Sequence, residues 1–351
     1  MAKVKFGDVV KDVKINVDRT NNPYERYIAG DHMDSEDLTL RRWGHFATDD
    51  VGPAFIRIFK PGQVLYGSRR TYLKKVAVAH FEGITANTTF VLETKDDNIF
   101  AQRLLPFLML SENFTNYSIR KSKGSTNPYV LFSDLADYEF ELPSIEEQRV
   151  LADKLWAAYE LKEAYKKMIA ATDEMVKSQF IEMFKGDDQV PLGDICNIEK
   201  GATITRNDVL PGDIPVVAGG QEPSCYHNVA NREAGAITVS ASGAYAGYIN
   251  LWSCPIFASD CNTVISKDAE KTDQTFVYFG LKAMQKQIYG LQKGGAQPHV
   301  YGKDLQKFMF PHPSYAKQIE FSKMAKQADK SKFELRQAIE KIDKVMKSLL
   351  Q

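Results

Sequence analysis

The sequence predicts an α+β protein with two pseudo-symmetric modules, separated by two long antiparallel helices that form a coiled coil. Three observations favour this fold. One block of sequence occurs twice, which indicates an internal duplication. Each copy of the block continues into a stretch without Pro or Gly that has helical periodicity. The sequence ahead of each copy instead alternates short apolar runs with Gly, Asn and Asp, as strands and turns do.

The repeat has two parts. The main block aligns without a gap at an offset of 170 residues, so that Pro143 matches Pro313 and Gln148 matches Gln318. The module starts also resemble each other, because VKFGDVV from position 4 is similar to VPLGDIC from position 190, an offset of 186. The first variable region is therefore longer by 16 residues, the difference between the offsets. Shared ends with divergent middles indicate two modules of one architecture that recognise different things.

Each copy of the block ends in a predicted long helix. Ser144 followed by Glu147 fits a capping box, and no Pro or Gly follows before Gly186. Apolar residues recur in alternating steps of four and three, which is the coiled-coil pattern, and both copies place a lysine in the seam, Lys162 and Lys332. The predicted coiled-coil packing residues are Leu151, Leu155, Tyr165, Ile169, Val176, Phe321, Leu335, Ile339, Ile342 and Met346.

A helix of about 40 residues would span about 60 Å, which is too long for an ordinary globular helix. Separate helical hairpins or a homodimeric coiled coil would both explain the pattern. We favour packing of the two copies on each other within the chain, because the duplication supplies two matched stripes and neither buries its apolar side alone.

The two variable regions are interpreted as α+β modules with a substantial β core. Strand-like runs include PAFIRIF and GQVLYG in the first and GAITVSASG in the second, and a helical pattern follows late in each. We expect the first module at 1–143 and the second at 187–313. The long helices are expected at 144–186 and 314–351.

The totals are those of a soluble globular protein. The 351 residues suffice for two domains, and 44% hydrophobic with 26% charged residues lies near average usage. No apolar run approaches the roughly 18 residues of a membrane-spanning helix, and the start has no secretory signal, so we expect a cytoplasmic protein. The formal net charge is zero, which alone argues mildly against nucleic acid as a partner.

The motifs of covalent chemistry are missing. The four cysteines form no C-x-x-C pair and no His lies at zinc-finger spacing, so we expect free thiols and no metal site. A DNA amino-methyltransferase would carry an N/D-P-P-Y/F tetrapeptide, whereas the sequence at 127–129 is only NPY, and no glycine-rich loop is available for S-adenosylmethionine. A nuclease interpretation has only the E-x-K at 93–95. We predict that the chain performs no catalysis.

The motifs resemble those of one known family. The segment YIAGDHMDSEDLTLRRWG (27–44), the pair GSTNPYV and LPSIEEQRVLADKL, and the second pair GGAQPHV and FPHPSYAKQIE are similar to specificity subunits of type I restriction–modification systems. The resemblance covers essentially the whole chain. One departure is that Ala316 and Lys317 stand where the first copy has Glu146 and Glu147, which weakens the second helix cap.

The resemblance implies a function. Each module would be a target recognition domain that reads one half of a split DNA sequence, and the helices would set the unspecified spacer. The helices would also dock two methyltransferase subunits, and restriction (translocase-nuclease) subunits can join that complex. No cofactor would bind this chain. S-adenosylmethionine would be bound by the methyltransferase, which flips the target adenine, and ATP and Mg by a restriction subunit.

Basic, hydroxyl and amide residues in predicted turns are the candidates for DNA binding. Arginine can donate paired hydrogen bonds to guanine or phosphate, and Lys, Ser and Thr add phosphate contacts. A single such cluster is usually a solvated surface, but clusters at corresponding places of duplicated modules favour binding. The candidates are Arg41, Arg42, Arg69, Arg70, Tyr72, Lys74, Arg120, Lys121, Lys123, Ser125, Thr126 and Asn127 in the first module, and Lys200, Thr203, Thr205, Arg206, Gln221, Ser242, Tyr245, Lys293 and Gln297 in the second.

An alternative from a different class is a two-headed coiled-coil adaptor that binds protein or glycan. It explains the long helices and the duplication, but it leaves the basic turns unexplained. Retention on DNA that falls with salt would separate the two hypotheses.

Overall fold

The computed structural model describes residues 2–18 and 21–350, which fall into two compact units. Unit 1 contains the chain up to Ala164 together with the part from Ala338, and unit 2 is Tyr165–Gln337. The first and last residues of the expected boundaries, 1 and 351, lie outside the described residues. Among the described residues, no helix is long and apolar enough to span a membrane.

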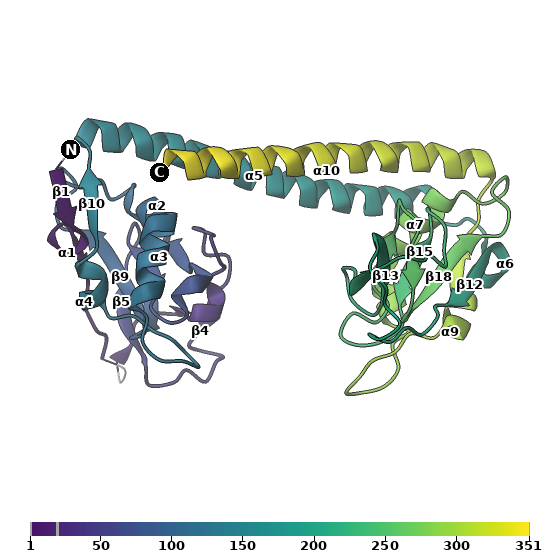
Figure 1. Ribbon diagram of the computed structural model, residues 1–351, viewed down its shortest axis with the longest axis horizontal. Coiled ribbons are helices and arrows are strands. Elements are labelled where there is room, and N and C mark those ends of the chain that lie inside the picture. Colours follow the sequence, from purple (N-terminus) through teal and green to yellow (C-terminus); the bar gives the residue numbers. More distant parts are fainter. Residues whose placement is uncertain (1, 19–20, 351) are drawn as a thin grey trace. The chain divides into compact units, whose positions relative to one another are not determined.

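The two long helices are α5 (Ile145–Met183) and α10 (Tyr315–Leu349), and each contributes to both units. The capping box begins α5: Glu147 N donates to Ser144 Oγ at 3.3 Å, and Ser144 N donates to Glu147 Oε2 at 2.9 Å. The chain leaves the helix at Gly186, whose φ of +86° suits glycine. The α+β fold class with long helices is therefore confirmed (Figure 1).

A buried glutamine ties each long helix to its module. Gln148 accepts a hydrogen bond from Ala101 N at 2.9 Å and donates to Ile99 O at 3.0 Å. Gln318 makes the same contacts, accepting from Asp273 N at 2.9 Å and donating to Lys271 O at 3.0 Å. Both glutamines are fully buried, so these partners replace the water that an amide would otherwise need.

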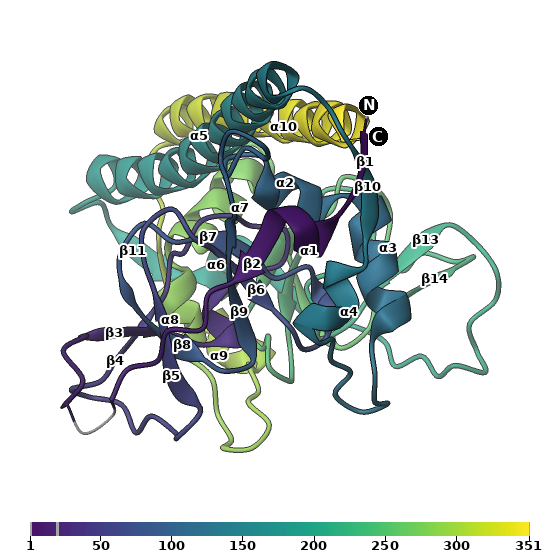
Figure 2. The ribbon, with the colours of Figure 1, turned by 90° about the vertical axis from the view of Figure 1, so that its left-hand side faces the viewer.

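Unit 1 contains two four-stranded sheets, ordered β2-β9-β6-β7 and β4-β3-β8-β5, and a separate β1-β10 ladder. Its strands are β1 (Ala2–Lys5), β2 (Val10–Asp12), β3 (Arg26–Ile28), β4 (Gly44–His45), β5 (Phe55–Phe59), β6 (Val64–Gly67), β7 (Val76–Val78), β8 (Gly83–Ala86), β9 (Thr89–Thr94) and β10 (Glu139–Leu142). Its short helices are α1 (Phe6–Val9), α2 (Leu105–Leu110), α3 (Glu112–Lys121) and α4 (Phe132–Ala136). Figure 2 shows the loop from α3 to α4 on the side of the unit away from α5.

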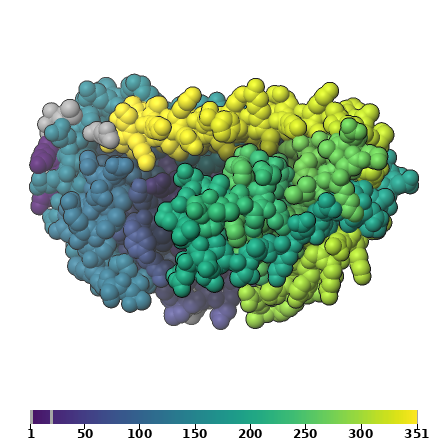
Figure 3. All heavy atoms as spheres, turned by 45° about the vertical axis from the view of Figure 1, so that its right-hand side comes forward, coloured from purple at the N-terminus to yellow at the C-terminus, as the bar shows by residue number. Residues whose placement is uncertain are grey.

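Unit 2 repeats this plan with sheets β12-β18-β15-β16 and β14-β13-β17 and a β11-β19 ladder. Its strands are β11 (Gln189–Pro191), β12 (Cys196–Lys200), β13 (Ile214–Val217), β14 (Cys225–His227), β15 (Ile237–Ser240), β16 (Ile249–Leu251), β17 (Phe257–Ala258), β18 (Cys261–Ser266) and β19 (Met309–Pro311). Its short helices are α6 (Leu192–Ile195), α7 (Gln274–Ala283), α8 (Gln285–Tyr289) and α9 (Gly302–Gln306). In Figure 3 the yellow-green segment ahead of α9 extends from this unit on the side away from the yellow α10.

Comparing the two units shows where the additional residues of the first variable region lie. The connection from β3 to β4 covers residues 29–43, whereas its counterpart from β13 to β14 covers only residues 218–224. Strand β5 follows β4 and pairs with β8, but the described β14-β13-β17 sheet contains no such fourth strand. The additional residues of unit 1 are thus a long loop and an additional strand.

The long helices pack on each other and on the module cores. In unit 1, Leu349 of α10 lies beside Leu151 near the start of α5, and Asp343 pairs with Lys162 further along α5. The direction is antiparallel. Leu155 and Tyr159 of α5 enter the same core as the buried side chains of α2, α3 and β9, so this part of the seam serves the module as well as the partner helix.

Unit 2 has the same antiparallel packing. Phe321 of α10 packs edge-to-face against Phe180 of α5, with ring centroids 5.4 Å apart. Lys332 of α10 forms an ion pair with Asp173 of α5. Of the ten predicted packing residues, Leu155, Val176 and Phe321 are buried. The other seven, Leu151, Tyr165, Ile169, Leu335, Ile339, Ile342 and Met346, are half-buried.

Candidate DNA interface

Two equivalent loops occupy the same place in the two units: L1 (residues 123–129) and L2 (residues 293–299). L1 is closed by paired backbone hydrogen bonds, Lys123 N to Tyr129 O at 2.8 Å and Tyr129 N to Lys123 O at 2.9 Å. L2 is closed in the same way by Lys293 and His299, at 2.9 and 2.8 Å. The second residue of each loop is a glycine with positive φ, +87° in L1 and +97° in L2, which permits the tight turn.

A lysine fixes the base of each loop. Lys123 Nζ lies 2.9 Å from Asp134, and Lys293 Nζ lies 2.7 Å from Asp304. Burial would raise the pKa of Asp134, but the hydrogen bonds from Lys123 and from Leu131 N, together with the nearby lysine charges, outweigh burial and lower this pKa. The hydrogen bond from Lys293 lowers the pKa of Asp304. These lysines are thus held at the loop base, while the predicted tip residues, Ser125, Thr126 and Asn127 in L1 and Gln297 in L2, are exposed.

A second turn lies against L1. Arg70 N donates to Pro128 O at 2.6 Å, Arg69 forms a β-bridge with Tyr129, and Thr71 Oγ1 lies 3.1 Å from Ser122 Oγ. Arg70 has a left-handed backbone, with φ of +51°, which is uncommon for a residue with a side chain. The turn thereby brings Arg69 and Arg70 next to the end of L1, at Pro128 and Tyr129.

The side chains around L1 differ in their freedom to bind a ligand. Arg69, Arg70 and Arg120 are exposed, and no hydrogen bond or ion pair of their guanidinium groups occurs with the described residues. Tyr72 is 52% exposed. Lys121 lies over the ring of Tyr117 at 5.4 Å. Lys74, by contrast, is paired with Glu36.

Unit 2 places a turn against L2 in the same manner. Gly243 N donates to Pro298 O at 3.1 Å and Ser242 forms a β-bridge with His299. Tyr245 in this turn is 47% exposed. The Ser242 hydroxyl donates to Asp260, so it is engaged within the unit.

The remaining candidates of unit 2 lie at different distances from this turn. Gln221 is near this turn. Gly219, two residues before it, packs so closely against Ser242 that a Cβ on Gly219 would lie only 2.6 Å from Ser242 O. Lys200 and Thr203 flank a segment that hydrogen-bonds to the backbone of residues 258 and 261. Thr205 instead caps its own turn by donating to Asp208, and this lowers the pKa of Asp208. Arg206 is exposed beside it, and no hydrogen bond between described residues joins either residue to L2.

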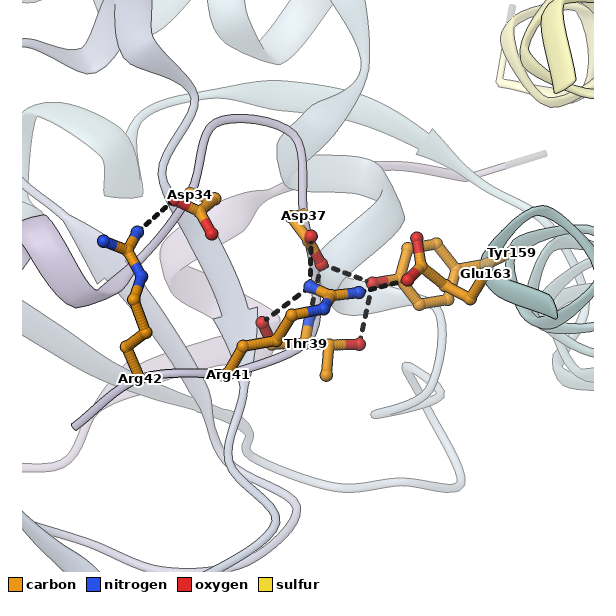
Figure 4. Close-up of polar contacts among 7 residues, drawn as sticks. All are labelled: Asp34, Asp37, Thr39, Arg41, Arg42, Tyr159 and Glu163. Carbon is orange, nitrogen blue, oxygen red and sulfur yellow. Dashed lines mark hydrogen bonds and ion pairs between the residues drawn. The ribbon is translucent and has the colours of Figure 1, made fainter. Parts of the chain in front are cut away.

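Arg41 and Arg42 lie elsewhere in unit 1, in the anchor loop (residues 34–42). Figure 4 shows Arg41 between Asp37 of its own loop and Glu163 of α5, while Arg42 points away and pairs with Asp34. Burial would lower the pKa of Arg41, but these carboxylates outweigh it and raise the pKa. The structure therefore does not bring Arg41 together with the turn and loop that hold Arg69 and Asn127.

Tyr159 of α5 completes the attachment of the anchor loop. Its hydroxyl donates to Asp37 Oδ1 at 2.7 Å and lies 2.8 Å from Thr39 Oγ1. Sequence reasoning missed this role of Tyr159, Glu163 and Asp37, because nothing in the linear pattern pairs the loop with the helix. Asp134 and Asp304 were also missed as loop anchors, although the repeat aligns them.

The comparisons with known proteins agree with this geometry. A family model described as "Type I restriction modification DNA specificity domain" matches residues 56–170 and 186–344. The specificity subunit of the type I restriction enzyme EcoDI from Escherichia coli is 23% identical over 187 residues, which cover 52% of this chain and 40% of that protein. The chain therefore spans less than half the length of this curated relative.

Solved structures share the fold. The crystal structure of the S subunit of a type I restriction–modification system from M. genitalium aligns with a TM-score of 0.65 and 16% identity, covering 99% of this chain and 94% of that one. A chain from a structural study of complex assembly and conformational transition of the type I R-M system aligns with a TM-score of 0.58 and 19% identity, covering 99% and 96%.

Proposed function

Because the chain belongs to the family of type I restriction–modification DNA specificity domains, we propose that it is the DNA sequence-recognition subunit of a type I restriction–modification complex. Each module, 1–143 and 187–313, reads one half of a bipartite DNA target. The observation that carries this proposal is the pair of equivalent exposed loops, L1 and L2, whose frames are the same and whose tip residues differ. A common frame with different side chains is what two readers of two sequences need.

The tip residues supply the chemistry of base reading. Asn127 in L1 and Gln297 in L2 are exposed amides, and such amides pair bidentately with the N6 and N7 atoms of adenine in the major groove. Arg69 and Arg70 carry exposed guanidinium groups next to L1, suited to guanine or phosphate. Ser125, Thr126, Arg120, Lys121 and Lys200 add phosphate contacts, which position the module without reading sequence.

The helices α5 and α10 serve the assembly in this proposal. They set the unspecified spacer between the two half-sites and dock two methyltransferase subunits in the cytoplasm, with restriction subunits able to join. The chain itself supplies no catalytic group. S-adenosylmethionine belongs to the methyltransferase, and ATP with Mg to a restriction subunit. Zero net charge is compatible with this role because the partners contribute phosphate contacts.

The test is methylome sequencing of a host that expresses this chain with its methyltransferase subunit. We expect a new modified-adenine motif with two short defined halves and a fixed gap. Replacing residues 4–143 with another module of the family should then change one half alone. If the complex assembles and no motif appears, and if the purified complex shows no salt-dependent retention on DNA, the adaptor hypothesis replaces this one.

A further inference from the structure

Each unit contains a cavity where the helix after the central sheet meets the two long helices. In unit 1 it holds about 230 Å³, and in unit 2 about 610 Å³. The repeat aligns Lys162 and Asp343 of the first cavity with Lys332 and Asp173 of the second. The contacts of Gln148 and Gln318 show that Ala101 and Asp273 are equivalent positions. By the same alignment, Phe107 in unit 1 corresponds to Phe279 in unit 2. The two cavities are therefore the same site in two forms.

In unit 1 the anchor loop partly fills the site. Leu38 is only 2% exposed and belongs to the core that contains Phe107 and Tyr159. Glu36, on the same loop, lines the cavity and pairs with Lys74. In unit 2 the corresponding connection, residues 218–224, is shorter, and none of its residues lines the cavity.

The lining of the site in unit 2 has an excess of positive charge. Its lining contains five cationic side chains and three carboxylates, whereas the lining in unit 1 contains three of each. Two of the three carboxylates, Asp173 and Asp329, form ion pairs with Lys332. Lys177 pairs with the third, Glu174. The remaining cations are Lys282, Lys286 and Arg336.

Lys282 stands where unit 1 has Leu110. Its ammonium group lies over the ring of Tyr248 at 4.7 Å and makes a long 3.4 Å hydrogen bond to Ile249 O. Burial lowers its pKa. Within the described chain it has no carboxylate partner. Asp173 and Asp329 attract Lys282 only from a distance, because both form their ion pairs with Lys332. Half-burying a lysine without an ion-pair partner is unfavourable, so a ligand that brings a carboxylate would be stabilised there.

A large apolar side chain lies one helical turn from Arg336. Phe333 is 57% exposed on α10, at the position that the repeat aligns with Glu163, the residue that receives the anchor loop in unit 1. A large exposed aromatic beside a cation without an ion-pair partner is typical of an interaction site rather than of ordinary surface.

We propose that the cavity of unit 2 is a docking site for an acidic segment of a partner protein. A carboxylate of that segment meets Lys282 and Arg336, as Glu36 meets Lys74 in unit 1, and an apolar side chain of the segment enters the cavity as Leu38 does. The anchor loop thus shows, within the same chain, the chemistry that we expect the site in unit 2 to bind. This inference does not depend on which DNA sequence the modules read.

The test uses the full chain and a fluorescein-labelled peptide with the sequence of residues 33–40, MDSEDLTL. The matched control peptide carries Glu36→Gln and Asp37→Asn. Fluorescence anisotropy should show saturable binding of the acidic peptide and at least about tenfold weaker binding of the neutral one. Lys282→Leu, which introduces the residue of unit 1, and Arg336→Gln should each weaken binding about tenfold, while Lys323→Gln, on an exposed part of α10, should not.

Circular dichroism of each variant checks that it is folded. Equal binding of the two peptides, or binding that neither Lys282→Leu nor Arg336→Gln weakens, would overturn the proposal. Inorganic phosphate is the probe for a small-anion site. If phosphate raises the melting temperature of the wild type but not of Lys282→Leu, and the peptide does not bind, the site takes free anions and the proposal is wrong.

Discussion

The phenol of Tyr159, on α5, donates a 2.7 Å hydrogen bond to Asp37, which lies 122 positions earlier in the chain. This bond fastens the anchor loop of the first module to the helix that follows the module. With the ion pair from Arg41 to Glu163 beside it, unit 1 has a direct side-chain link between its variable region and α5. Unit 2 has Asp329 and Phe333 at the two corresponding helix positions.

We predict that Tyr159→Phe destabilises unit 1. The substitution keeps the ring in the core and removes the hydroxyl, so its half-buried contacts with Asp37 and Thr39 are lost at a cost of about 1–2 kcal/mol. Urea unfolding measures the change. Tyr165→Phe, on the same helix, is the matched control, because no hydrogen bond of Tyr165 to a described residue is present. Equal stability of Tyr159→Phe and wild type would show that the hydroxyl contributes nothing.

Arg69→Ala and Arg41→Ala should have different effects on modification. Arg69 is exposed next to L1, so its loss should weaken or relax one half of the motif only, by about 1–3 kcal/mol if it contacts a base. Arg41 is held by Asp37 and Glu163, so its loss should lower stability and leave the recognised bases unchanged. Methylome sequencing and urea unfolding measure the two effects. A changed base preference in Arg41→Ala would make Arg41 a reader.

The base of L2 should open in acid. The Lys293 hydrogen bond lowers the pKa of Asp304 below its ordinary value of 3.8, so the pair stabilises the folded loop above that value. This stabilisation is lost as the pH falls through the lowered pKa. An NMR titration of the Asp304 carboxyl carbon should give a midpoint below 3.8 in the wild type and close to it in Lys293→Ala. An unchanged midpoint would show that the ion pair is not populated in solution.

Because of Lys332, the stability of unit 2 should fall at alkaline pH. Burial would lower its pKa, but Asp173 and Asp329 outweigh burial and raise it above the ordinary 10.5. A raised folded pKa contributes stability that is complete below 10.5 and disappears as the pH rises through the folded value. Urea unfolding from neutral pH to above 10.5 should show this loss in the wild type. Lys332→Met should lack it, while the equivalent Lys162→Met should keep it.

The long helices could be predicted because their signal is local and repeated. The Ser144–Glu147 cap and the heptad seam both depend on spacing along one helix, and Gln148 recurs as Gln318 because both tie a helix to its module. The lysines in the seam could be found in the same way. Their partners Asp343 and Asp173 could not, because pairing depends on the register in which the two antiparallel helices face each other, which is a tertiary property.

The candidate site was predictable only in part. L1 and L2 contain predicted residues because the repeat marks both loops, and the turn with Arg69 meets L1 through backbone bonds that no pattern encodes. Arg41 belonged to a basic cluster in the sequence, yet the carboxylates of Asp37 in its own loop and of Glu163 on α5 pair with it. A cluster of charge in the sequence therefore says little until its counter-ions are known.

Gln148 and Gln318 join each long helix to its module through main-chain atoms of the module alone, the amide of residue 101 or 273 and the carbonyl of residue 99 or 271. Every amino acid has a main-chain carbonyl that can accept this bond, and every one except proline has a main-chain N–H that can donate it. The joint therefore places almost no demand on the side chains of the module it holds. Genetic exchange can therefore deliver a module with unrelated surface residues without breaking this joint.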